Sequence, residues 1–113
     1  MITRSTSRPL TPAEREVLDF LLDGGFHGAA ALRAQAKTAR VTGRCGCGCP
    51  TIDLEVDVSL PVAHLDEPVE ADAPGGGLIV FADGGRLSCL EYWTTGDDVP
   101  AEFPPLDRIQ RYR

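Results

Sequence analysis

The chain has 113 residues, of which 42% are hydrophobic and 25% are charged, as in an ordinary globular protein with room for one core. Seventeen acidic residues oppose eleven basic ones, and the formal charge of −6 would repel a phosphate backbone. No basic stripe is interleaved with aromatic residues, so we expect no nucleic-acid partner. No apolar run has the length of a membrane span or of a secretory signal, so we expect a cytoplasmic protein without membrane contact.

Residues 1–10 are polar and lack periodicity, which predicts a flexible N-terminal tail. A helix is predicted to follow, because Thr11 can cap it, Pro12 suits its first position and Glu14 stands at the capping-box position. Apolar residues then recur at three- and four-residue spacing, which indicates a buried stripe. These residues are Val17, Leu18, Leu21 and Leu22.

A second helix is predicted over residues 28–39, where alanines and Leu32 share one face. The opposite face carries basic side chains, which we interpret as a solvated surface. These are Arg33, Lys37 and Arg40.

From Val41 onward the hydrophobic period changes to two. Residues 51–58 alternate strictly, which predicts a strand with a dry face and an acidic wet face. The segment 41–45 is predicted to pair with it as a hairpin, with Cys45 opposite Ile52 and facing the core. The dry face comprises Ile52, Leu54, Val56 and Val58, and the wet face Asp53, Glu55 and Asp57.

A second hairpin is predicted at residues 78–93, because Asp83-Gly84-Gly85 separates two apolar runs. Residues 61–77 are loop-like, with a weak strand signal at 69–72. Helices followed by strands indicate an α+β domain at residues 11–95, with two N-terminal helices packed on one face of a four- to five-stranded antiparallel sheet. Residues 96–113 are predicted to be a proline-rich C-terminal extension, anchored by Phe103 and Leu106.

Three of the four cysteines stand at every second residue in Cys45-Gly46-Cys47-Gly48-Cys49-Pro50. Cysteine thiolates bind zinc and Cu(I), and a reducing cytoplasm keeps thiols available. The candidate metal ligands are therefore Cys45, Cys47 and Cys49, with Cys89 as a fourth. His27 and His64 are the other candidates for the fourth position. The one-residue gaps differ from the two-residue gaps of zinc fingers and ribbons.

Two other interpretations of this segment stay open. Cys47 and Cys49 could form a reversible disulfide, although no helix N-terminus is predicted nearby to activate a thiol. Alternatively, the thiols act as small apolar groups in a tight turn that glycine permits and Pro50 ends.

No complete catalytic constellation is visible. Ser88 lacks the flanking glycines of a nucleophile elbow, and the glycines at 75–77 precede a strand instead of a helix. The leading hypothesis is a non-enzymatic binding or interaction module that meets a protein partner or a second copy of itself. The alternatives are a metal-binding protein that uses zinc or copper, and a thiol redox protein.

The segment 44–52, with its Cys-Gly-Cys-Gly-Cys-Pro-Thr-Ile turn, and the later segment 87–93 resemble a group of small bacterial proteins, mainly actinobacterial. The resemblance covers about residues 10–105 in overall layout. It implies a small cytoplasmic bacterial domain and carries no activity or ligand.

Overall fold

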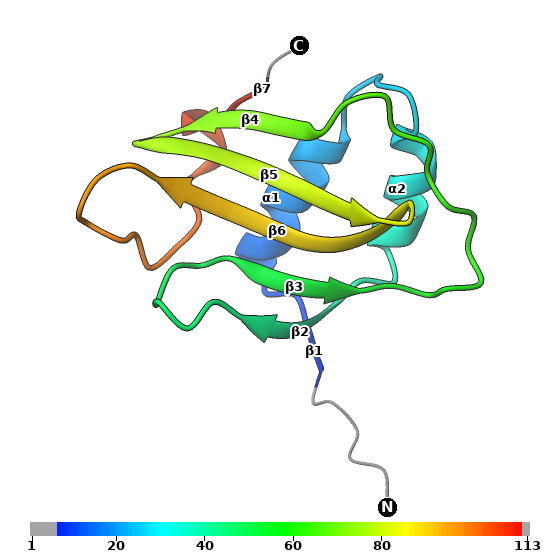
Figure 1. Cartoon of the computed structure of the whole chain (residues 1–113), viewed down its shortest axis with the longest axis horizontal. Coiled ribbons are helices and arrows are strands. Elements are labelled where there is room, and N and C mark those ends of the chain that lie inside the picture. Colours follow the sequence, from blue (N-terminus) through cyan, green and yellow to red (C-terminus); the bar gives the residue numbers. More distant parts are fainter. Residues whose placement is uncertain (1–6, 112–113) are drawn as a thin grey trace, which may run out of the picture.

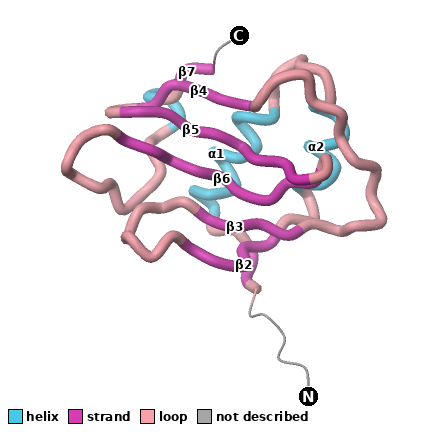
Figure 2. Tube along the Cα trace, in the orientation of Figure 1, coloured by secondary structure: helices cyan, strands magenta, loops and turns pink. Residues whose placement is uncertain are grey.

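The computed structural model describes residues 7–111 and places seven antiparallel strands in one sheet, in the order β1-β2-β3-β6-β5-β4-β7 (Figures 1 and 2). Most of the predicted N-terminal tail, residues 1–6, and the last two residues of the predicted extension lie outside the described residues. The elements in chain order are β1 (Arg8–Pro9), α1 (Pro12–Leu22), α2 (Ala29–Ala36), β2 (Arg40–Arg44), β3 (Ile52–Glu55), β4 (Val69–Ala73), β5 (Gly76–Asp83), β6 (Arg86–Thr94), the 3-10 helix η1 (Leu106–Arg108) and β7 (Gln110–Arg111).

The predicted α+β class with an antiparallel sheet is confirmed, but the predicted count of four to five strands is too low. The two outermost strands, β1 and β7, are each two residues long and carry no alternating pattern. Each forms because its backbone pairs with a longer neighbour, β1 with β2 and β7 with β4. Short edge strands of this kind also limit pairing with other chains.

The predicted capping box of α1 is present. The Glu14 backbone N–H donates to the Thr11 hydroxyl at 3.1 Å, and the Thr11 N–H donates to the Glu14 carboxylate at 2.9 Å. Arg8 adds two hydrogen bonds of 2.9 Å to the same carboxylate and so ties β1 to the start of α1. Burial opposes the Glu14 charge, but the bonds from Arg8 and Thr11 outweigh it and lower the pKa of this carboxyl.

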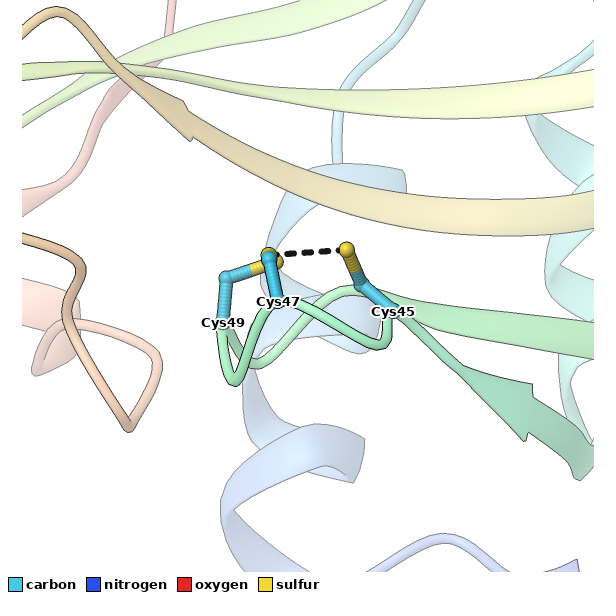
Figure 3. A group of neighbouring side chains, drawn as sticks. All are labelled: Cys45, Cys47 and Cys49. Carbon is cyan, nitrogen blue, oxygen red and sulfur yellow. Dashed lines mark hydrogen bonds between the residues drawn. The ribbon is translucent and has the colours of Figure 1, made fainter.

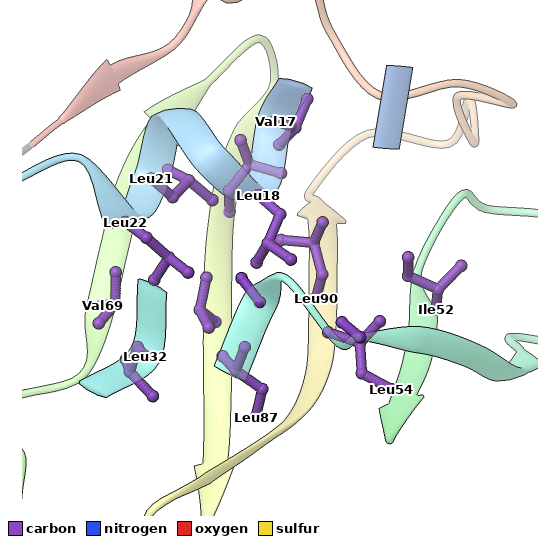
Figure 4. Close-up of a cluster of buried hydrophobic side chains, with 14 of the residues drawn as sticks. Val17, Leu18, Leu21, Leu22, Leu32, Ile52, Leu54, Val69, Leu87 and Leu90 are labelled. Atoms are coloured by element: carbon purple, nitrogen blue, oxygen red, sulfur yellow. The ribbon is translucent and has the colours of Figure 1, made fainter. Parts of the chain in front are cut away.

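The core lies between the helices and the sheet (Figure 4). In Figure 1 both helices lie behind the sheet; α1 contacts β4, and α2 contacts β6. The apolar stripe of α1 is buried as its spacing predicted. The side chains that are fully buried in this cluster include Leu18, Leu22, Leu32, Ile52, Leu78 and Leu90.

One polar side chain is built into this core. Gln35 of α2 is 0% exposed, and its amide group donates to the carbonyls of Pro61 and Gly85 at 3.0 and 2.9 Å. Its carbonyl accepts the N–H of Leu87 at 2.9 Å. We call these three contacts the Gln35 clamp; they join α2 to the β5–β6 hairpin and to the loop before β4.

The turn of that hairpin is Gly84-Gly85, with φ of +59° and +83°, as a two-residue type I′ turn requires. A Cβ at residue 85 would come within 2.6 Å of the Ala63 carbonyl oxygen. The Asp-Gly signal thus predicted the right hairpin, and the close approach of Ala63 explains the second glycine. The weak strand signal at residues 69–72 is also confirmed as β4. β5 begins at Gly76, within the stretch predicted as a loop, where it pairs with β4 and β6. A Cβ at this position would overlap the Trp93 backbone, which explains the glycine.

The alternating pattern predicted a strand over residues 51–58, but β3 covers only Ile52–Glu55. Ile52 and Leu54 are buried as predicted, but Val58 is 71% exposed, so its placement on the dry face is wrong. The chain leaves the sheet after Glu55 because Asp57 forms a turn, in which its carboxylate accepts from the N–H and hydroxyl of Ser59. Asp57 therefore belongs to a loop and not to the acidic row of the strand.

Within the predicted extension, residues 103–111 contact the sheet and the helices, whereas residues 96–99 are exposed. Ile109 is buried in the core, and β7 pairs with β4. Phe103 stacks on Tyr92 with ring centroids 6.4 Å apart, and Leu106 is partly buried against the core. Arg111 lies over the Phe20 ring of α1 at 4.4 Å.

Candidate metal centre

The three clustered cysteines lie on the loop between β2 and β3. The loop is closed by a hydrogen bond of 3.2 Å from the Cys45 N–H to the Thr51 carbonyl, and Gly48 takes a φ of +95° inside it. A Cβ at Gly46 or Gly48 would meet no atom within 4 Å, so this part of the loop is open to solvent. We call residues 45–49 the thiol loop.

The prediction that Cys45 faces the core is wrong. A bulge between Val41 and Gly43 shifts the register, so that Arg44 lies opposite Ile52 in the place predicted for Cys45. Cys45 lies beyond the end of β2 and is exposed, whereas Cys49 is 9% exposed. The residue that turns inward is therefore the last of the three cysteines and not the first.

The loop brings all three thiols together, as Figure 3 shows. The sulfur atoms of Cys45, Cys47 and Cys49 lie within 4.8 Å of one another, and those of Cys45 and Cys47 are 2.8 Å apart. Sulfurs that share one zinc ion at a bond length of about 2.3 Å are separated by about 3.8 Å in a tetrahedral site. An ion would thus need the two closest sulfurs to separate by about 1 Å, and the open loop gives them the space.

Cys45 and Cys49 do not ionise alike. Burial opposes ionisation of Cys49, but hydrogen bonds from Thr51 and from the other two thiols outweigh it and lower the pKa of Cys49 to about 7. The hydrogen bond with Cys47 raises the pKa of Cys45. Cys49 therefore loses its proton more readily than Cys45, and its thiolate is available near neutral pH to start binding a cation.

Cys89, the fourth cysteine proposed as a ligand, is not in this group. It lies inside β6, opposite Asp53 of β3 and Phe81 of β5, and is partly exposed. Burial, followed by the charges of Asp53, Glu91 and Asp83, raises the pKa of the Cys89 thiol to about 11. Such a thiol stays protonated at neutral pH, unlike Cys49. The other candidates for the fourth position, His27 and His64, are exposed loop residues and also lie outside the group.

Thr51 is a functional candidate that the sequence did not reveal. Its hydroxyl accepts the Tyr92 N–H of β6 at 3.1 Å, and Thr51 is also the main hydrogen-bond partner that favours the Cys49 thiolate. The hydrogen bond to Tyr92 could not be predicted from a local pattern, because it joins residues 41 positions apart.

Within residues 7–111 neither helix combines the length and the apolar content that a bilayer span requires. No protein-family model, curated protein or solved structure matches the chain.

Proposed function

We propose that this protein binds a soft metal ion through Cys45, Cys47 and Cys49. The observation that carries the proposal is the convergence of three sulfur atoms within 4.8 Å of one another on one short loop. Thiolates select soft ions such as Cu(I) and zinc over the hard cations that prefer oxygen ligands. A reducing cytoplasm is the compartment that suits such a site, because thiols persist there as potential ligands.

Cu(I) fits the ligand set better than zinc. A structural zinc site is closed by four protein ligands, and within residues 7–111 no fourth histidine, cysteine or carboxylate joins the group. Cu(I) accepts fewer thiolates, so the three cysteines suffice for it. Zinc would need a ligand from solvent or from another molecule.

The test is a titration of reduced, metal-free protein with Cu(I) in competition with a coloured chelator, and with zinc in parallel. We expect one Cu(I) per chain, bound more tightly than zinc, with a thiolate-to-copper absorption band in the ultraviolet. Cys47→Ser should lower the affinity for Cu(I) by more than roughly 100-fold, which is the loss expected when a residue that only supports a metal ligand is removed. Cys89→Ser is the matched control and should bind as the wild type does.

The result distinguishes the alternatives. A chain that binds neither ion would overturn this proposal and return the leading role to the interaction module. If Cys89→Ser bound Cu(I) as weakly as Cys47→Ser does, the assignment of three cysteine ligands would be wrong. The redox hypothesis predicts instead that mild oxidation converts the wild type, but not Cys47→Ser, into a form with two fewer free thiols. Cys47 is the residue to replace, because its sulfur takes part both in the predicted Cys47–Cys49 disulfide and in the close contact with Cys45.

A further inference from the structure

Two of the three proposed ligands, Cys45 and Cys47, are exposed, and the loop that carries them is open to solvent. Three thiolates suffice for Cu(I), but because the loop is open, a thiol of another molecule can reach the bound ion. The site thus has the form of one that exchanges its ion. The features around it indicate what kind of molecule receives the ion.

The face of the sheet turned away from the helices is acidic. Along β6 the buried Leu90 and Tyr92 alternate with Cys89, Glu91 and Trp93, so these last three belong to the opposite face. In Figure 1 this face is at the front, and no helix lies over it. Strand alternation puts more carboxylates than cations on it, the carboxylates being Asp53 and Glu55 of β3, Glu70 and Asp72 of β4, Asp83 of β5 and Glu91 of β6.

The thiol loop borders this acidic face. The charges that disfavour ionisation of Cys89 come from Asp53, Glu91 and Asp83 and, more weakly, from Cys45 of the loop. Asp53 is the partner of Cys89 across the β3–β6 pair, and the thiol loop ends at Cys49, three residues before β3 begins at Ile52. A molecule that approaches the exposed sulfurs therefore also approaches these carboxylates.

The same face has apolar side chains at its centre. Phe81 is 41% exposed and Trp93 is 39% exposed, on neighbouring strands. Exposed aromatic groups ringed by charge are typical of protein contacts, where aromatic anchors supply affinity and charges select the partner. The combination fits a protein surface with a positive charge and does not fit a small anionic thiol, which the carboxylates would repel.

We propose, on the premise of the soft-metal site above, that the chain passes its ion to a thiol-bearing protein whose docking surface is cationic. The step is a ligand exchange without change of oxidation state. Each incoming thiol forms a metal–sulfur bond and gives its proton to a departing cysteine thiolate of the loop, so that charge and protons balance. The acidic face steers the acceptor toward Cys45 and Cys47.

The experiment measures Cu(I) transfer from the loaded protein to two synthetic acceptors. Both peptides carry the same Cys-Gly-Gly-Cys pair, flanked by lysines in one and by glutamates in the other. We expect second-order transfer that is at least about tenfold faster to the lysine peptide, since electrostatic steering changes association rates by about 10- to 1,000-fold. The preference should largely vanish in about 1 M salt, where charges are screened within about 3 Å.

A matched pair of variants locates the effect. The double variant Asp53→Asn with Glu91→Gln should lose most of the preference for the lysine peptide. The double variant Glu16→Gln with Asp19→Asn removes the same amount of charge from exposed positions on α1. It should retain the preference for the lysine peptide. Equal rates to the two peptides, a rate independent of acceptor concentration, or equal effects of the two variants would overturn the inference.

Failure of the inference and failure of the proposed function are distinguishable. A protein that takes up no Cu(I) fails at the loading step, before any transfer is measured, and both proposals then fall. A protein that loads normally but shows no preference between the peptides keeps its metal site and loses only the cationic acceptor.

Discussion

The Gln35 clamp and the thiol loop are both groups of polar or soft atoms that the fold gathers in one place. In the clamp, the carbonyl and amide of a 0% exposed side chain are matched by backbone groups of the same chain, at 2.9 to 3.0 Å. In the loop, the sulfurs of Cys45 and Cys47 are 2.8 Å apart, and both residues are exposed. The Gln35 clamp has its hydrogen-bond partners within the molecule, whereas the thiol loop can still bind a ligand from outside.

The difference separates a structural role from a functional one. A buried amide with all its partners holds elements together, and its loss leaves unpaired polar groups in the core. An exposed set of soft ligands adds little to the folded state, since the fold does not depend on what it binds. We therefore expect substitutions in the clamp to change stability and substitutions in the loop to change metal binding.

The largest stability effect is expected for Gln35→Leu. The variant leaves the buried Leu87 N–H without its acceptor and the part-buried Pro61 carbonyl without its donor, and the free energy of unfolding should fall by about 3 kcal/mol. Urea denaturation checks this, with Lys37→Ala at the exposed C-cap of the same helix as a control that should change stability by less than about 0.5 kcal/mol. Cu(I) affinity of the folded Gln35→Leu protein should be unchanged. A clamp variant as stable as the wild type would contradict the structural role.

A pair of glycine substitutions compares the two regions directly. Gly85→Ala places a Cβ about 2.6 Å from the Ala63 carbonyl at a φ of +83° and should cost about 2 kcal/mol. Gly46→Ala in the thiol loop meets no atom within 4 Å and should change stability by less than about 0.5 kcal/mol. Thermal unfolding of both metal-free variants provides the measurement. Equal losses of stability in the two variants would mean that the thiol loop is packed as tightly as the region around the clamp, and would contradict an open loop.

The smallest expected effect is the pH dependence of the metal-free loop. The pKa of Cys49, about 7 in the folded protein, lies below the ordinary thiol value of about 8.5, so the folded state favours the thiolate. Its contribution to stability is fully present above the ordinary value and is lost as the pH falls through about 7. As the pH falls from about 8.5 through about 7, the free energy of unfolding of the wild type should therefore decrease relative to that of Cys49→Ser.

Ultraviolet absorbance of the thiolate provides the second measurement of this effect. The first titration in the wild type should have its midpoint near pH 7 and should move upward in Thr51→Val, which removes the hydroxyl that favours the thiolate. Cys89→Ser serves as the control and should leave the midpoint in place, because the pKa of Cys89 is about 11. A midpoint that stays at the ordinary thiol value in the wild type would exclude this account of the loop.

The sequence by itself determined the local elements of this protein. The capping box, the apolar stripe of α1, the two-residue alternation at Ile52 and Leu54, and the glycine turn after Asp83 each express a preference carried by neighbouring residues. The thiol loop was also predicted to join two paired strands, because its glycines and Pro50 interrupt the alternation. These features need no knowledge of what packs against them.

Only the tertiary structure decided which sulfur points where and which strands meet. The bulge in β2 turned Cys45 outward, and the pairing of β3 with β6 placed Cys89 opposite Asp53, apart from the group. The edge strands β1 and β7 and the clamp of Gln35 likewise join residues far apart in the chain. Such contacts depend on backbone groups that every residue carries, so no pattern of side chains in the sequence announces them.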